Sequence, residues 1–498
     1  MHPIQRILGL LLMLFSLTML VPVAIAWVEH DSGLQPFLMA FGTLLGVGFI
    51  LWLPARGIRR DLRLRDGFMV VVLFWFVLGL AGAVPLSLAV KPSLGVADAV
   101  FESLSGLTTT GATVITNIEE LPESLLMYRQ LLQWLGGMGI IVLAVAILPM
   151  LGVGGMQLYR AETPGPMKDN KLKPRITETA KALWYIYLGL TVCCGFAYWW
   201  AGMSAFDAIG HSFATIAIGG FSTHDASLGH FDSPLIEAVA IVFMTIAGMN
   251  FALHYVAALN FVASRGKSPR AIGNSVKNSV KTYVHDEEWR TYVTLLATLG
   301  VVVSGGLWLA DVFGGLTESL RYGIFQTVSI ATTTGFTTAG YHLWPSFLPV
   351  LLLFASFVGG CAGSTGGGLK VIRVLLLFKQ GRREVVRLMH PSAHVPIKVG
   401  GVPMSERIMD AVWSFFAAYV ALFAIMMLAL MATGLDQVTA FSAVVACLNN
   451  LGPGLGDVGA SYAALGDTAK WILCFAMVLG RLEIFTLLVV LSRSYWRD

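Results

Sequence analysis

Four short loops bring threonine and glycine into a sequence that is otherwise strongly apolar. They read LTTTGATVIT (107–116), AIGGFST (217–223), ATTTGFTTAG (331–340) and NNLGPGLG (449–456). Their backbone carbonyls are oxygen donors, and glycine lets a backbone turn its carbonyl without a Cβ clash. Rings of such carbonyls replace the water shell of an ion in selectivity filters. The chemistry that these residues favour is therefore cation coordination.

The four loops are evenly spaced along the chain. Aligning them puts Gly111, Gly220, Gly335 and Gly452 at one position, separated by 109, 115 and 117 residues. A steady period indicates repeated structural units. Each loop follows a half-length apolar segment and precedes a long one, so each unit reads as span, re-entrant half-helix, loop and span. One such loop alone would be read as an ordinary turn, but four in register favour a shared site.

The elements that carry these loops must lie in a membrane. The chain has 498 residues, of which 56% are hydrophobic and 12% charged, and its mean hydropathy is +0.74. Too few polar groups exist to cover such a chain in water. Apolar segments of about 20 residues are the expected unit of a spanning helix. Ten segments qualify: 8–27, 37–55, 68–90, 126–150, 183–201, 234–262, 290–312, 346–377, 409–432 and 470–492.

The predicted fold is an all-α integral membrane protein with ten transmembrane helices. Four span–pore-helix–filter–span repeats form a pseudo-fourfold arrangement, and two N-terminal helices stand outside it. The first span resembles a signal peptide in its basic start and its AIA at 24–26, but we interpret it as a retained helix because its apolar run is long. The expected units are 1–65 (N-terminal helices), 66–160, 161–270, 271–400 (with a gating loop) and 401–498.

Lysine and arginine set the expected orientation. All but five of the 33 basic residues fall in six regions that span counting assigns to one side. The positive-inside rule makes that side cytoplasmic, so both termini are expected inside the cell. The basic runs 160–181 and 370–398 are long enough to contact a partner protein. Charges spread over short loops argue against a nucleic-acid partner.

The expected filter combines the aligned glycines with the residues before them. Irregular backbone at membrane depth is tolerated only where it is buried in protein or lines a water-filled cavity. Half-helices that end at the loops would direct the negative ends of their dipoles at the ion. The predicted ion-binding residues are Thr110, Gly111, Gly219, Gly220, Thr334, Gly335, Leu451 and Gly452.

A gate is expected in the long segment 346–377. Six of the ten residues from Gly359 to Gly368 are glycine. At about 1 kcal/mol each relative to alanine, they disfavour a continuous helix by about 6 kcal/mol. A loop that obstructs a pore is predicted, and close helix packing through small residues is the alternative. The candidate gate residues are Gly359, Gly360, Gly363, Ser364, Thr365, Gly366, Gly367, Gly368 and Lys370.

Arg481 is the second gate candidate because it lies within the apolar segment 470–492. A central arginine costs about 2.5–3.5 kcal/mol to insert, so it should face the protein interior or a wet cavity. In a pore it would repel cations. The alternative is a structural ion pair with Glu483 or with a pore-helix acid such as Glu102. We expect Glu102, Asp207, His211 and Glu318 to make buried polar bonds or to attract cations weakly.

Together these motifs resemble the TrkH/TrkG branch of the Trk–Ktr–HKT superfamily of potassium transporters. The residues that carry the resemblance are the four loops, GGCAGSTGGGLKVIR (359–373) and LGRLEIFTLL (479–488). The resemblance implies potassium uptake across the bacterial inner membrane, potassium at the filter, and the 359–368 loop as the gate. It also implies a homodimer and a TrkA-like cytoplasmic subunit that binds nucleotides. The fourth loop departs most from the Thr-Gly pattern.

Three further sequence patterns bear on function. GLGD (454–457) matches the GxGD pattern of intramembrane aspartyl proteases, which need a second aspartate in reach, and no such partner precedes it. The 359–370 stretch fails the phosphate-loop pattern, so no organic cofactor is expected.

An ion-coupled carrier, moving potassium with a proton or sodium, is the serious alternative, because internal repeats and broken helices also mark carriers. Parallel repeats around one axis favour a pore. The ten histidines show no metal-ligand spacing.

Overall fold

The computed structural model describes residues 2–57, 64–142, 172–262 and 269–496, and these are overwhelmingly helical. One two-residue hairpin, β1 (Lys398–Val399) with β2 (Val402–Pro403), is antiparallel. The helices are α1 (His2–Thr18), α2 (Leu20–Glu29), α3 (Leu34–Trp52), α4 (Leu64–Leu88), α5 (Val96–Leu107), α6 (Glu123–Val142), α9 (Leu172–Trp200), α10 (Ala205–Ala217), α11 (Pro234–Ala247), α12 (Phe251–Val262), α13 (Pro269–His285), α14 (Glu287–Leu309), α15 (Leu316–Ala331), α16 (Leu348–Val358), α17 (Val371–Met389), α18 (Glu406–Ala432), α19 (Gln437–Leu448), α20 (Asp467–Arg481), α21 (Phe485–Leu491) and α22 (Arg493–Trp496).

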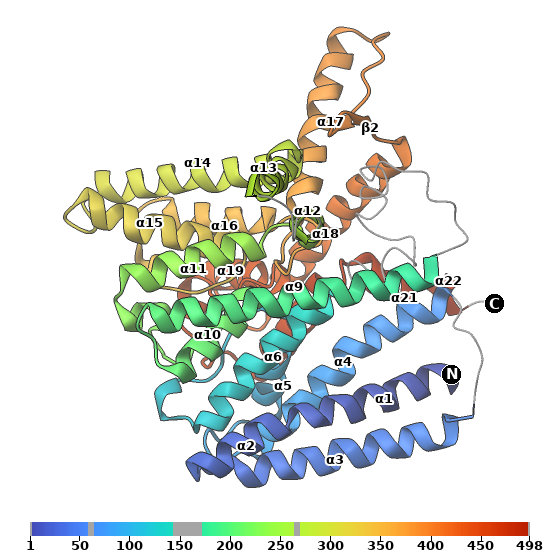
Figure 1. Cartoon of the computed structure of the whole chain (residues 1–498), viewed down its shortest axis with the longest axis vertical. Coiled ribbons are helices and arrows are strands. Elements are labelled where there is room, and N and C mark those ends of the chain that lie inside the picture. Colours follow the sequence, from blue (N-terminus) through green and yellow to red (C-terminus); the bar gives the residue numbers. More distant parts are fainter. Residues whose placement is uncertain (1, 58–63, 143–171, 263–268, 497–498) are drawn as a thin grey trace.

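Six helices of the described residues are long and apolar enough to cross a membrane, and two bent pairs raise the number to eight. They correspond to eight of the ten expected segments. Of the other two, 126–150 runs past residue 142 out of the described residues, and 346–377 is divided between α16 and α17. The helical, membrane-spanning class is therefore confirmed. In Figure 1 the long helices α1, α3, α4, α9 and α14 run in roughly one direction.

Short buried helices carry the four glycine loops. These are α5, α10, α15 and α19, with 12 to 16 residues each. Capping side chains fix two of their starts: Ser204 accepts the Asp207 N–H, and Asp436 accepts two N–H groups at the start of α19. Such caps satisfy backbone donors that would otherwise be unpaired. Each helix ends three or four residues before its aligned glycine, so the loop begins at the helix terminus.

Two expected spans are bent rather than straight. The segment 234–262 breaks between α11 and α12 at 91°, and 470–492 breaks between α20 and α21 at 112°. At the first break, the Gly248 carbonyl accepts the Cys361 N–H and the Phe251 N–H donates to the Gly363 carbonyl. At the second, Glu483 and Ile484 both have positive φ. The 359–370 segment thus supplies hydrogen-bond partners for the backbone groups that are freed at the first break. Helix propensity alone could not predict these partners.

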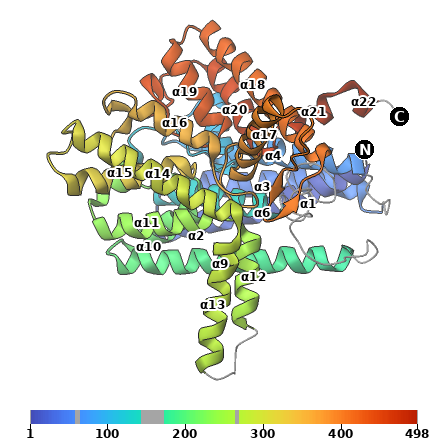
Figure 2. The same ribbon diagram turned by 90° about the horizontal axis from the view of Figure 1, so that it is seen from above.

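The segment predicted to form a gate is not helical from residue 359 to 370. It joins α16 to α17 and lies among elements from most of the chain, whereas α17 projects away from the body (Figure 1). The pair α12 and α13 also extends outward, as Figure 2 shows. The cysteines are free thiols, and only Cys193 among them is exposed. The other four are buried.

Candidate ion-conduction site

The four glycine loops meet in a closed ring. A Cβ built on each aligned glycine would overlap the carbonyl oxygen of a residue in the next loop. That carbonyl always belongs to the residue just before the next aligned glycine. The pairs are Gly111 with Gly219, Gly220 with Thr334, Gly335 with Leu451, and Gly452 with Thr110. Eight predicted filter residues from four distant segments therefore lie together, in chain order around one centre.

The four loops share one backbone conformation. The aligned glycines have φ between +78° and +98°, and the residues two positions earlier have φ between +51° and +67°. In each loop, the N–H of the residue before the glycine donates to a carbonyl five residues earlier at 2.7–2.8 Å. The donors are Thr110, Gly219, Thr334 and Leu451. Glycine alone adopts positive φ without strain and leaves room for the neighbouring carbonyl. The fourth loop shares this backbone conformation, although its sequence departs most from the Thr-Gly pattern.

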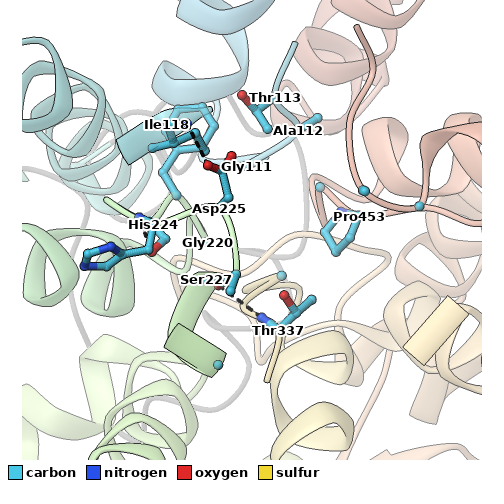
Figure 3. Close-up of a pocket in the computed structure, with 18 of the residues that line it drawn as sticks. Gly111, Ala112, Thr113, Ile118, Gly220, His224, Asp225, Ser227, Thr337 and Pro453 are labelled. Atoms are coloured by element: carbon cyan, nitrogen blue, oxygen red, sulfur yellow. Dashed lines mark hydrogen bonds between the residues drawn. The ribbon is translucent and has the colours of Figure 1, made fainter. Parts of the chain in front are cut away.

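Residues that follow the glycines line a cavity of about 400 Å³, here called the mouth cavity. All four aligned glycines contribute to its wall. Figure 3 shows Gly111, Gly220, Thr337 and Pro453 reaching it from four parts of the chain. Its charged lining is mixed, with Arg129 and Asp225 both present. The cavity is wide enough for hydrated ions to approach the ring.

Side chains outside the loops hold two of the ring segments in place. Gln133 of α6 donates to the Gly219 carbonyl at 2.6 Å and accepts the Phe221 N–H at 3.0 Å. Tyr462 donates to the Gly452 carbonyl at 2.8 Å. These residues were missed at the sequence level. Gln133 carried a usable signal, because a polar side chain within an apolar span needs a partner.

A buried ion pair ties the first loop to the second. Glu102 of α5 accepts from Arg129 at 2.8 Å and from the Val114 N–H at 3.0 Å. Arg129 donates in turn to the Ser222 carbonyl and lies 4.2 Å above the Phe221 ring. Both charged side chains are almost completely buried. Glu102 thus makes the buried polar bonds expected of it, and it is not the partner of Arg481.

The predicted gate loop lies against the residues that precede the glycines, on the other side of the ring from the mouth cavity. The Gly367 N–H donates to the Thr333 hydroxyl at 2.7 Å, and the Gly368 N–H donates to the Asn449 carbonyl at 3.2 Å. Thr365 donates to the Ile216 carbonyl at 3.0 Å. This segment therefore contacts the third and fourth glycine loops and the end of α10, just before the second loop. The other gate candidates, Gly359, Gly360, Gly363, Ser364 and Gly366, lie within the same segment.

Arg481 joins the first filter loop to the gate loop. Its guanidinium donates to the carbonyls of Thr108 and Thr109, and to those of Thr365 and Gly366 at 3.1 and 3.3 Å. It is 6% exposed. It ends α20 at the bend instead of lying within a straight span, which corrects the sequence expectation. Within the described residues no carboxylate pairs with it.

The remaining charges near the gate loop are arranged around a small space. Glu483, the other proposed partner of Arg481, pairs with Arg373 instead. The Lys370 ammonium donates to the Gly366 carbonyl. With Arg481, these groups line a space of about 40 Å³, which has room for few water molecules. This space is small, and its charged lining holds three basic side chains and one acid.

The fold defines a multi-spanning helical membrane protein in which four glycine loops meet in a ring of backbone carbonyls. The family of TrkH cation transport proteins matches residues 34–497, and the chain belongs to it. It is 56% identical to the Trk system potassium uptake protein TrkH of Vibrio parahaemolyticus, over 99% of both chains, and 40% identical to TrkG of Escherichia coli, over 98% and 97%. The crystal structure of the potassium transporter TrkH from Vibrio parahaemolyticus superposes with a TM-score of 0.90 at 53% identity, covering 100% and 99% of the chains. These relatives are named as transporters, which are not enzymes.

The buried pair gives a stability prediction. Glu102→Ala leaves Arg129 buried without its carboxylate, and breaking such a pair costs about 3–5 kcal/mol. The variant should melt at a clearly lower temperature in detergent, measured by fluorescence-detected size exclusion. Glu318→Ala, which removes an exposed acid from α15, is the control and should melt like the original protein. Equal melting of both variants would contradict the structural role of the pair.

Proposed function

We propose that this chain takes up potassium across the bacterial inner membrane through a channel-like pore with a four-loop filter. The observation that carries the proposal is the ring in which each aligned glycine faces a carbonyl of the next loop. Taking a small ion out of water costs on the order of 20 kcal/mol in a Born estimate. Oxygen ligands converging from four sides offset that cost without a carboxylate ring. The names of the relatives supply the ion.

The proposed filter comprises the eight ring residues, with potassium as the transported ion and no organic cofactor. The side chains of Gln133 and Tyr462 would keep the ring from collapsing on a smaller ion. In this proposal four repeats, in units near 66–160, 161–270, 271–400 and 401–498, surround the pore. The two N-terminal helices and a total of ten crossings complete the arrangement.

The proposed gate is the 359–368 loop with Lys370 and Arg481. A positive charge at roughly 5 Å opposes a potassium ion by about 3 kcal/mol at an effective dielectric constant of 20. Arg481 also bonds directly to the proposed gate loop. Opening requires those bonds to break and the guanidinium to move away from the path. Movement of α17, which begins at Val371, would pull the loop through Lys370.

We further propose that both termini are cytoplasmic and that a TrkA-like nucleotide-binding subunit contacts the cytoplasmic side. Support comes from the basic residues gathered on one side of the predicted spans. Part of that surface, residues 160–171, lies outside the described residues. The chain is proposed to act as a homodimer in the lipid bilayer, without nucleic acid.

The filter proposal predicts that Gly335→Ala abolishes most potassium uptake. The new Cβ would overlap the Leu451 carbonyl, and φ of +85° strains alanine by about 1–3 kcal/mol. Uptake of a rubidium tracer should fall about tenfold or more, since 1.4 kcal/mol changes a rate tenfold. The control is Gly434→Ala, where φ is +101° but the added Cβ meets nothing. Equal loss in both variants would point to backbone strain alone.

The gate proposal predicts that Arg481→Ala raises potassium flux. Removing the charge and its bonds to Thr365 and Gly366 frees the loop. A rise of about tenfold requires only 1.4 kcal/mol from the barrier, and it should appear in liposomes without any regulatory subunit. Arg481→Lys, which keeps the charge, should rise less. Unchanged flux together with a lowered melting temperature would favour a structural role.

A pore and a carrier differ in what drives them. In proteoliposomes under an imposed voltage, with no proton or sodium gradient, the pore predicts sustained potassium flux through the Arg481→Ala variant. An ion-coupled carrier predicts flux only when the second ion has a gradient. The bent pairs α11–α12 and α20–α21 are compatible with a carrier, because broken helices also form carrier sites. Voltage-driven flux without a second ion would exclude that alternative.

A further inference from the structure

A cluster of imidazole and carboxylate groups lies at the rim of the mouth cavity. His224 lines the cavity, and so do Ile118 and Gly229, the chain neighbours of Glu119 and His230. One ligand atom from each of Glu119, His224 and His230 lies within 4.8 Å of the others. The three residues come from the segments that follow the first and second filter loops. We propose that they form a binding site for a divalent transition metal, with Zn²⁺ as the best fit.

The separations suit a metal better than direct hydrogen bonds. The Glu119 Oε1 atom lies 3.4 Å from Nδ1 of His224 and 3.5 Å from Nδ1 of His230. These are longer than ordinary N–H···O hydrogen bonds. Two ligands of a tetrahedral zinc with bonds of about 2.0–2.1 Å stand roughly 3.3 Å apart. Neither ring nitrogen of His224 has a hydrogen-bond partner among the described residues.

A second carboxylate lies on the far side of the His224 ring, close enough to bond it once Nδ1 is held by a metal. The Asp207 Oδ1 atom lies 3.4 Å from Nε2, the nitrogen on the far side of the ring. Asp207 is itself held by the hydroxyls of Thr223 at 2.7 Å and Ser204 at 2.8 Å. A carboxylate behind a metal-binding histidine fixes the tautomer and makes the ligand more basic. Nδ1 of His224 is thereby left to face Glu119 and the metal.

The ligand set selects the class of metal. Two imidazoles and one carboxylate suit zinc, nickel or copper, whereas magnesium, calcium and potassium prefer oxygen ligands alone. The rings of His224 and His230 are parallel with centroids 3.5 Å apart, so one ring must rotate for both Nδ1 atoms to reach one ion. His230 has the room, since its side chain is 43% exposed. Water would supply the fourth ligand.

The bound metal would join the two outer segments at the rim. These segments are already connected, because Asp225 accepts the Ile118 N–H at 2.9 Å (Figure 3). A divalent charge there would oppose approaching cations and stiffen both segments. Micromolar zinc is therefore expected to reduce cation flux. Binding itself does not depend on the transport proposal, so the two are tested separately.

The test is zinc titration calorimetry on the full-length protein in detergent, without a polyhistidine tag. One site per chain is expected, with at least tenfold weaker binding in His224→Ala, His230→Ala and Glu119→Gln. His342→Ala is the matched control, because His342 lines the same cavity outside the cluster and its loss should leave zinc binding unchanged. Binding retained by a His224→Ala/His230→Ala double variant, or no saturable binding, would overturn the proposal.

A thermal readout guards against variants that fold poorly. Zinc should raise the melting temperature of the original protein and of His342→Ala, because a ligand that binds the folded state stabilises it. In Asp207→Asn, the zinc-induced rise in melting temperature should shrink markedly or vanish. Acid should weaken binding, since histidine must be neutral to bind. An equal thermal rise in every variant would contradict the site.

Discussion

At each aligned glycine, a backbone carbonyl of the next loop occupies the space that a side chain would fill. The arrangement of the surrounding elements depends on this close approach of the four loops. No residue other than glycine fits beside the neighbouring carbonyl at these points. The loops can approach so closely only because helices α5, α10, α15 and α19 end at the ring. Their polar backbone would be unstable in an apolar environment unless each group found a partner. Gln133 and Tyr462 supply such partners from outside the loops.

The same requirement explains the far side of the ring. A segment rich in glycine cannot form a stable helix, so its N–H and carbonyl groups must be satisfied elsewhere. They bond to the bend between α11 and α12, to Thr333, to Asn449 and to Arg481. The Arg481 guanidinium donates hydrogen bonds to four backbone carbonyls and to the Thr109 hydroxyl. Within the described residues, no carboxylate is therefore bonded to its charge.

The ring could be located from sequence because glycine at a steady period reflects a local backbone need. The break after Gly359 was predictable for the same reason, since helix propensity is also local. The bend at 248–250 was not, because its freed backbone groups bond to the distant 359–370 segment. The bend at 482–484 was not, because its positive φ angles fall on Glu483 and Ile484 instead of on glycine. The alternative interpretation of Arg481, an ion pair with Glu483 or Glu102, was wrong, since each acid pairs with a different arginine in the fold. The cluster of Glu119, His224 and His230 was not predicted either, because its residues follow two loops that lie about a hundred residues apart in the sequence.

The contacts of Arg481 have a thermodynamic consequence. One guanidinium donates to carbonyls in the first filter loop and in the 359–370 segment, so the two cannot rearrange independently. Coupling free energy acts equally in both directions. If the ring binds an ion as proposed, a change that displaces the segment and alters ion affinity by some factor is matched by an equal effect of the bound ion on the segment. Ion concentration would then act as an effector of its own passage.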